Sequence, residues 1–206
     1  MSPVTGAQAS TPLAAEVAAV TAQIAGESSA DDLLALALVA HVASASAGHI
    51  VVVGAGFGRA ALALGAVARA TGRGRVFAID LFPDTEETGD PLGWTLDGFL
   101  GQVVERGLIE YVLPHHGTAG TFAHLMPEDF RCGLILLESA HACTEIGGDL
   151  VALEHHLAPG GWLCVDAAFS SFPGASDALD TLLQQRGPYD LGRRLTDGLF
   201  AVRKRA

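Results

Sequence analysis

The 206-residue chain is poor in basic and aromatic side chains. It has 12 Lys and Arg against 23 Asp and Glu, a formal net charge of −11, and aromatic residues make up only 6% of it. A surface of that charge repels the phosphate backbone of nucleic acid, and so few rings offer little for stacking on bases. Nucleic acid is therefore not the expected partner.

Cysteine is also scarce, and no two cysteines have the spacing of a metal or redox motif. Cys132, Cys143 and Cys164 leave one unpaired in any disulfide arrangement. We expect reduced, buried thiols in a cytoplasmic protein.

The sequence lacks a basic start and a long apolar run. No Lys or Arg precedes Arg59, whereas secretory signals begin with positive charge and transit peptides are rich in arginine. The most apolar stretch, residues 33–53, is interrupted by His41, Gly48 and His49. It predicts a buried helix followed by a buried strand rather than a transmembrane helix, so we expect no membrane partner.

What the chain has in quantity is apolar residues, which make up 50% of it beside 17% charged residues. A chain of this length and composition can bury the core of one domain. We expect residues 1–30 to form an N-terminal extension with a helix at 14–25. It could cover a pocket, mediate a dimer contact or do neither. We expect residues 31–206 to form the main domain, and Asp31 and Asp32 suit the start of its first helix.

From His49 onwards, strand-like and helix-like segments alternate. Residues 49–53 include four consecutive β-branched residues, which is typical of a strand buried in a parallel sheet. Further strands are expected at residues 75–79, 109–113, 132–137 and 161–165, and helices at 33–45, 59–70, 94–107, 119–125, 148–157 and 173–185. An Asp197-Gly198 hairpin signal lies between strand-like runs at 189–195 and 199–203. The pattern predicts an α/β fold with three layers and a mostly parallel sheet.

The turn after the first strand is rich in glycine. Gly54-Ala55-Gly56-Phe57-Gly58 follows residue 53 directly and opens the next helix. Glycines let the backbone approach a ligand closely, and N–H groups at a helix start face the same point. This turn is a candidate binding loop, with a turn that binds nothing as the alternative. Arg59 stands where a nicotinamide fingerprint has its third glycine, which disfavours a pyrophosphate ligand.

Polar residues also follow the later strands, where ligands of open parallel sheets bind. Asp80 could accept both hydroxyls of a ribose, Leu81 could lie on an adenine, and Thr118 could bond a base edge. Glu138 and Asp166 follow two neighbouring strands and could together hold a divalent cation, with water as the other ligands. The alternative is that Glu138 serves a cofactor and Asp166 only caps a turn.

These segments together resemble class I S-adenosylmethionine-dependent methyltransferases. Within that superfamily the chain is most similar to bacterial small-molecule O-methyltransferases, of the natural-product sugar and cephalosporin-hydroxylase-like kinds. The resemblance covers residues 33–203 and is carried by residues 52–58, 78–80, 117–118, 134–141 and 157–161. It implies a Rossmann-like three-layer sandwich whose seven-stranded sheet has an antiparallel last strand. It also implies S-adenosyl-L-methionine as cofactor.

The resemblance implies a role for each residue at the strand ends. The cofactor-binding residues would be Gly54, Ala55, Gly56, Gly58, Asp80, Leu81, Thr118 and Glu138. The glycines would pass under the methionine part of the cofactor and Asp80 would hold the ribose. Leu81 and Thr118 would contact the adenine, and Glu138 would lie near the sulfonium or the methionine amine.

Several positions depart from the family pattern. Val52 stands where an acid is usual, and Ala140 stands where metal-dependent members carry an Asp thought to act as base. Glu138 replaces an Asp, and Ala167 replaces an Asp or Asn. Glu138 and Asp166 remain the candidate ligands of Mg²⁺, but these losses disfavour a metal-dependent mechanism.

His141 is the first candidate for the base that removes the acceptor's proton, because an imidazole titrates near neutral pH. A structural histidine at a helix start is the alternative, and His115 and His116 are second choices. The predicted function is transfer of a methyl group to an oxygen of a small-molecule acceptor, which enters over residues 80–94, in a protein that could form a homodimer. A cofactor-binding module without catalysis and an NAD-dependent oxidoreductase are the other hypotheses.

Overall fold

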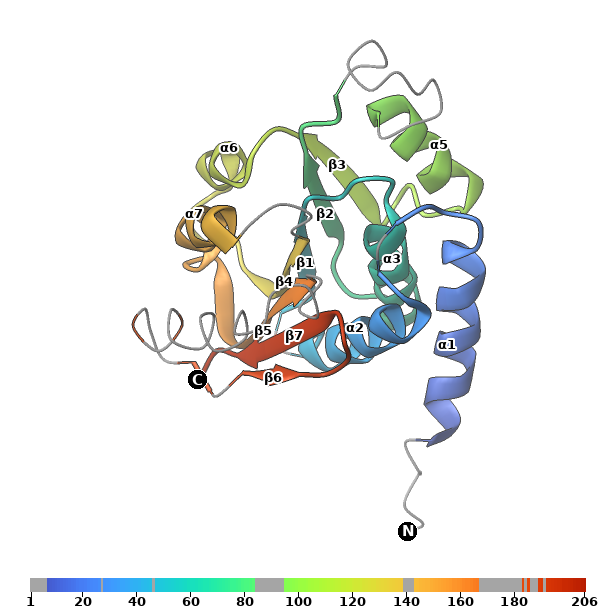
Figure 1. Ribbon diagram of the computed structural model, residues 1–206, viewed down its shortest axis with the longest axis horizontal. Coiled ribbons are helices and arrows are strands. Elements are labelled where there is room, and N and C mark those ends of the chain that lie inside the picture. The colour runs from blue at the N-terminus through green and yellow to red at the C-terminus, as the bar shows by residue number, and fades with distance from the viewer. Residues whose placement is uncertain are drawn as a thin grey trace.

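The computed structural model describes residues 7–26, 28–45, 47–83, 95–138, 143–166, 183, 185, 189–190 and 192–206. Its strands are β1 (His49–Val53), β2 (Val76–Asp80), β3 (Val112–His116), β4 (Cys132–Glu138), β5 (Leu157–Asp166), β6 (Arg193–Arg194) and β7 (Leu199–Arg203). Its helices are α1 (Ala7–Thr21), α2 (Ala30–Ala43), α3 (Arg59–Thr71), α5 (Leu96–Glu105), α6 (Ala119–Leu125) and α7 (Cys143–Leu153). Figure 1 shows the sheet at the centre with helices on both of its faces.

The strands form one seven-stranded sheet in the order β3-β2-β1-β4-β5-β7-β6. Strands β1 to β5 pair in parallel, whereas β7 runs antiparallel to β5, and β6 runs antiparallel to β7. The predicted α/β fold with a mostly parallel sheet is confirmed. Strands β2 and β3 lie on one side of β1, and β4 and β5 lie on its other side. The strand order therefore reverses between β1 and β4, which is the topological switch point of the sheet. Ligands of open α/β sheets bind in the crevice at that point.

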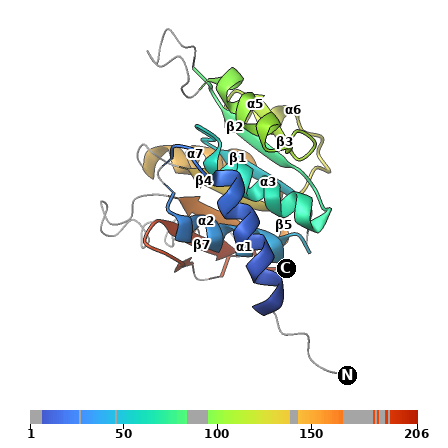
Figure 2. The ribbon, with the colours of Figure 1, turned by 90° about the vertical axis from the view of Figure 1, so that its right-hand side faces the viewer.

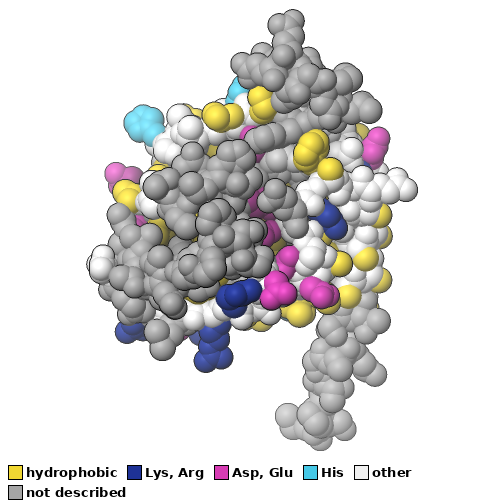
Figure 3. All heavy atoms as spheres, in the orientation of Figure 1, with side chains coloured by type: hydrophobic (Ala, Val, Ile, Leu, Met, Phe, Trp, Pro, Cys, Tyr) yellow, Lys and Arg dark blue, Asp and Glu magenta, His cyan; other side chains and the backbone are white. Residues whose placement is uncertain are grey.

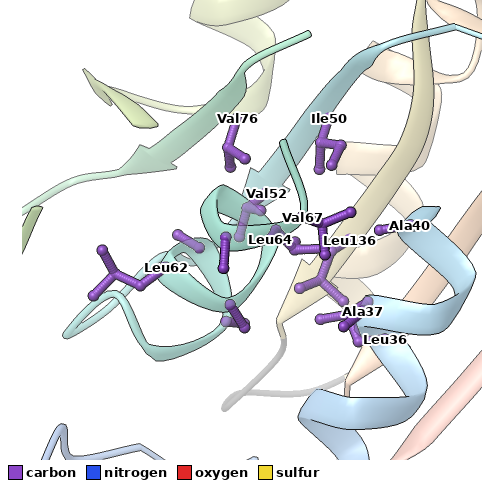
Figure 4. Close-up of a cluster of buried hydrophobic side chains, with 14 of the residues drawn as sticks. Leu36, Ala37, Ala40, Ile50, Val52, Leu62, Leu64, Val67, Val76 and Leu136 are labelled. Atoms are coloured by element: carbon purple, nitrogen blue, oxygen red, sulfur yellow. The ribbon is translucent and has the colours of Figure 1, made fainter. Parts of the chain in front are cut away.

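Two apolar clusters cover the two faces of the sheet. One contains buried side chains of α1, α2, α3 and α5, and the other contains those of α6 and α7. Figures 1 and 2 show these two groups of helices on opposite sides of the strands. In Figure 4, Leu36 and Ala40 of α2 and Val67 of α3 meet Val52 and Leu136 of the neighbouring strands. Burial on both faces explains why β1 and β4 consist almost wholly of apolar residues.

Two strand predictions need correction, and in each case the observed strand contains a proline. The third strand is Val112–His116 rather than residues 109–113, with Pro114 inside it. Because β3 is an edge strand that pairs only with β2, it can accommodate a residue without an N–H group. The fifth strand begins at Leu157 rather than at residue 161. The register of β4 and β5 shifts in this stretch, which accommodates Pro159.

Two helix predictions also need correction. The helix predicted at residues 148–157 is Cys143–Leu153, so it runs through Gly147 and Gly148 instead of beginning there. The N-terminal helix is Ala7–Thr21 rather than residues 14–25, and it includes Pro12. Glycine and proline have low helix propensity, so the sequence alone did not place them inside helices.

Two predictions are not tested by the structure, the division of the chain at residue 30 and the last predicted helix. Helix α1 is tied to α3 by an ion pair between Glu16 and Arg69 at 2.9 Å. The division of the chain at residue 30 remains a prediction. Of the helix predicted at 173–185, all but Leu183 and Gln185 lies outside the described residues.

The cysteines that the structure describes are free and buried. Neither Cys132 nor Cys164 forms a disulfide, as the sequence predicted. Burial raises the pKa of the Cys132 thiol to about 12 and that of Cys164 still further. None of the described helices is long and apolar enough to cross a membrane.

Asp32 links the start of α2 to the C-terminal hairpin. Ser29 is the N-cap of α2, and Asp32 Oδ2 accepts hydrogen bonds from the Ser29 N–H at 2.8 Å and from the Ser29 hydroxyl at 2.6 Å. Asp32 Oδ1 accepts from the hydroxyl of Thr196. Burial alone would raise the pKa of Asp32, but the hydrogen bonds from Ser29, Thr196 and Gly198 together hold it below its usual value.

We expect Asp32→Asn to lower the free energy of unfolding by about 1–2 kcal/mol at pH 7. Because the pKa is lower in the folded state, the contribution of the carboxylate is complete above about pH 4–5 and is lost as the pH falls through the folded-state pKa. Urea unfolding at pH 7 and at pH 3 checks this, with Asp129→Asn, at an exposed position in the loop before β4, as control. An equal difference from wild type at both pH values would contradict this role.

Candidate active site

Backbone hydrogen bonds to the end of β2 hold the glycine loop that follows β1. The N–H groups of Gly54 and Ala55 donate to the Ile79 carbonyl at 2.9 and 3.2 Å, and the Gly58 N–H donates to the Ala55 carbonyl at 2.8 Å. Gly54, Gly56 and Gly58 have φ angles of +84°, +50° and +94°, which residues with a side chain rarely adopt. The glycines are therefore required by the backbone path of this loop.

Gly54 also lies against the end of β4. A Cβ atom on Gly54 would lie 2.5 Å from the Glu138 carbonyl oxygen. A Cβ atom on Gly58 would lie 3.0 Å from the ring of Phe99 in α5. The loop thus passes closely between β1 and β4, at the switch point of the sheet.

Asp80, the last residue of β2, faces the glycine loop. It is only 6% exposed. Its Oδ2 accepts a hydrogen bond from the Gly56 N–H at 2.9 Å, and its Oδ1 accepts one from the Phe82 N–H at 3.0 Å. A carboxylate has about four acceptor sites, and these two amides fix the direction in which it faces. Asp80 therefore holds the glycine loop in place through Gly56 and the backbone after β2 through Phe82.

Leu81 and Thr118 lie close to Asp80, just after the carboxyl ends of β2 and β3. Leu81 is 61% exposed. The Asp80 carbonyl accepts a hydrogen bond at 2.8 Å from Gly117, the residue before Thr118. The exposed Thr118 is the N-cap of α6, where its hydroxyl accepts from the Thr121 N–H at 3.2 Å. The structure thus brings together the three residues for which the sequence predicted ribose and adenine contacts.

His115 and His116 do not follow the third strand, as predicted, but end it. His115 Nε2 lies 3.1 Å from the Thr121 hydroxyl, and burial, with a smaller effect of His116, lowers the pKa of His115. The ring of His116 packs edge-on against Phe82. Strand β3 is three positions from β4 in the sheet, about 14 Å at the usual strand spacing. That separation disfavours both residues as a base beside Glu138.

Glu138 and Asp166 end neighbouring strands and are direct partners in the register of β4 and β5. Asp166 Oδ2 accepts a hydrogen bond from the Ser28 hydroxyl at 2.5 Å. Within the part of the chain that the structure describes, no three His, Cys, Asp or Glu side chains are grouped to hold a metal ion. These two carboxylates alone do not make a Mg²⁺ centre, and metal binding by them stays a prediction. Figure 3 shows acidic side chains near the middle of the molecular face seen in Figure 1.

His141 and most of the loop predicted to admit the acceptor lie outside the described residues. His141 falls between Glu138, which ends β4, and Cys143, which begins α7, and Trp94 falls within residues 84–94. Residue 167 also lies outside them.

Ser28 and Arg59 meet the site through a connection that the sequence did not signal. Arg59 Nη1 donates to the Gly26 carbonyl at 3.2 Å, and Ser28 is bonded to Asp166 at 2.5 Å. Gly26 and Ser28, which lie just before α2, therefore contact the start of α3 and the end of β5. Partners so far apart in sequence share no local pattern, and residues 26–29 alone resemble an ordinary polar loop.

A family model described as a methyltransferase domain matches residues 51–167. The chain belongs to this methyltransferase family. The match begins in β1 and ends just past β5, so it includes every strand end described above. The resemblance to class I S-adenosylmethionine-dependent methyltransferases is confirmed, and the NAD-dependent oxidoreductase is set aside.

Solved structures of other methyltransferases share the fold. The O-methyltransferase NovP is 14% identical with a TM-score of 0.67, over 98% of this chain and 100% of that one. The O-methyltransferase TomG from Streptomyces achromogenes, solved in complex with S-adenosylmethionine, is 16% identical with a TM-score of 0.64, over 96% and 90%. The fibrillarin pre-rRNA processing protein of Methanococcus jannaschii is 16% identical with a TM-score of 0.55, over 78% and 68%. At these identities the likeness shows the fold alone. None of the curated proteins matches the sequence.

Proposed function

We propose that this methyltransferase binds S-adenosylmethionine across the glycine loop and Asp80 and transfers its methyl group to an oxygen of a small molecule. The observation that carries the proposal is the hydrogen bond of 2.9 Å from the Gly56 N–H to Asp80 Oδ2. It joins the loop at the switch point to the carboxylate at the end of the next strand. That pairing suits a nucleoside with a further group attached to its ribose.

The strand order supports one binding mode for the cofactor. Asp80 accepts the ribose hydroxyls, and the adenine lies toward Leu81 and Thr118. The methionine part passes over Gly54, Ala55, Gly56 and Gly58 toward Glu138. The ends of β2 and β4 are two strands apart, about 10 Å, a distance that the nucleoside with its methionine part spans. The negative charge of Glu138 attracts the cationic sulfonium and ammonium groups.

The reaction in this site is an in-line displacement at the methyl carbon. A lone pair of the acceptor oxygen forms the new O–C bond while the C–S bond breaks, and the bonding pair passes to sulfur, which leaves S-adenosylhomocysteine. The acceptor's proton goes to His141, the proposed base. Because the cofactor arrives activated, the protein has to align the two reactants and remove that proton. No step requires a metal ion.

The charge of the chain supports a small acceptor. With a net charge of −11, the protein repels RNA, whose binding depends on Lys and Arg contacts to phosphate. The exposed Leu38 and Val42 on α2, at 43% and 60%, support the predicted homodimer. A cytoplasmic location and a natural-product acceptor also belong to this proposal.

A methyl-transfer assay with labelled cofactor tests the function. Phenols, catechols, sugars and a structured RNA serve as acceptors, each with Mg²⁺ and with a chelator. We expect transfer to at least one small molecule and none to RNA. His141→Ala should then lower kcat about 10²- to 10⁴-fold without changing the affinity for S-adenosylhomocysteine. His124→Ala, at an exposed position of α6, is the matched control. Tight cofactor binding with no transfer to any acceptor would instead favour the module that has lost catalysis.

A further inference from the structure

Arg59 is the first residue of α3 and has hydrogen-bond donors that the fold does not use. Its Nη1 donates to the Gly26 carbonyl at 3.2 Å. Its Nε atom is buried and has no hydrogen-bond partner. None of the ion pairs among the described residues includes Arg59. A buried N–H group of a guanidinium without an acceptor is costly, so it points to an acceptor that arrives with a ligand.

The surroundings hold this guanidinium beside the glycine loop. A Cβ atom on Gly26 would lie 3.1 Å from Arg59 Cδ, so the bare glycine leaves room for the arginine stem. Two residues further along, Ser28 is bonded to Asp166 at 2.5 Å. Gly26 therefore lies against Arg59 on one side, and Gly58, the N-cap of α3, precedes it in the chain. This is the end of the loop over which the methionine part passes in the proposed binding mode.

The acidic residues of the site cannot bind one group of the cofactor, its carboxylate. The methionine part of S-adenosylmethionine carries a sulfonium, an ammonium and a carboxylate. Glu138 and Asp166 suit the two cations but repel the carboxylate. Arg59 is the sole Lys or Arg in residues 1–68, and it stands at the start of α3, where the helix dipole also favours an anion. Its planar fork of donors matches a carboxylate.

We infer that Arg59 binds the carboxylate of the methionine part of S-adenosylmethionine and so sets the position of the sulfonium above β4. The inference rests on the proposed function and assigns to that site a positioning residue that selects for the amino-acid end of the cofactor. It distinguishes Arg59 from Asp80, which serves the nucleoside end.

Two ligands that differ only at this end provide the test. S-Adenosylhomocysteine carries the carboxylate, whereas 5′-methylthioadenosine has the same nucleoside and sulfur but lacks the amino-acid group. We expect Arg59→Gln to weaken S-adenosylhomocysteine about 10- to 100-fold in isothermal titration calorimetry and to leave 5′-methylthioadenosine within about twofold. Arg59→Lys should recover part of the loss, because it keeps the charge without the fork. Arg73→Gln removes the same charge from an exposed position beyond the other end of α3 and should change neither affinity.

Three outcomes would overturn the inference. If Arg59→Gln weakens both ligands equally, the arginine only braces the loop. If it changes neither affinity while wild type binds both, the carboxylate is held elsewhere and the proposed function stands. If wild type binds neither ligand, the proposed function itself fails.

Discussion

Asp80→Ala is expected to weaken S-adenosylhomocysteine by about 100-fold or more, because two charge-assisted hydrogen bonds to the ribose disappear. The substitution also removes the acceptor of the Gly56 and Phe82 N–H groups, so the glycine loop loses its tie to β2. Isothermal titration calorimetry of wild type and variant measures the change. Both losses act on one site, so this substitution has the largest predicted effect on binding.

Two further variants identify the cause. Asp80→Asn keeps the shape and one acceptor oxygen but not the charge, and we expect it to lose less affinity than Asp80→Ala. Asp129→Ala removes an exposed carboxylate from the loop before β4 and should leave the affinity unchanged. Unaltered binding in Asp80→Ala would show that the nucleoside does not lie on this carboxylate.

Among the substitutions in the candidate site, Gly54→Ala is expected to lower stability most. The added methyl group would lie 2.5 Å from the Glu138 carbonyl oxygen, and that backbone atom ends β4, a central strand of the sheet. Gly54 also has a φ angle of +84°, at which a side chain is strained. We expect the free energy of unfolding in urea to fall by about 3 kcal/mol and cofactor binding to fall with it.

Gly101→Ala is the matched control for this substitution. Gly101 lies within α5, and a Cβ atom there would meet nothing within 4 Å. Alanine in a helix costs less backbone entropy than glycine, so the control should gain up to about 1 kcal/mol. If Gly54→Ala proved as stable as wild type, the close passage of the loop past β4 would be wrong.

Much of the fold could be predicted because its signals are local. The β-branched run of β1, the short helix α6 and strand β7 have the bounds that the sequence predicted. Errors arose where tertiary context outweighs residue preference. Pro114 lies within a strand because that strand is at the edge of the sheet, and Gly147 and Gly148 lie within a helix.

Some residues of the candidate site could be predicted from local sequence and others could not. The glycine loop and Asp80 were found because each directly follows a strand, and parallel strands bring their carboxyl ends to one edge. The roles of Ser28 and Arg59 depend on contacts with Asp166 and Gly26. Each of these contacts joins residues 33 or more positions apart, so no local motif could reveal it.

Hydrogen–deuterium exchange of the wild-type protein, with and without S-adenosylmethionine, tests the central claim most directly. If the cofactor lies across the glycine loop and Asp80, amides in residues 54–58 and 80–82 should exchange more slowly when it is present. A weaker effect is expected at Thr118, and none at the start of β4, because it lies at the opposite end of the parallel strands from the site. Protection confined to other segments, or none at a saturating concentration of the cofactor, would contradict the account.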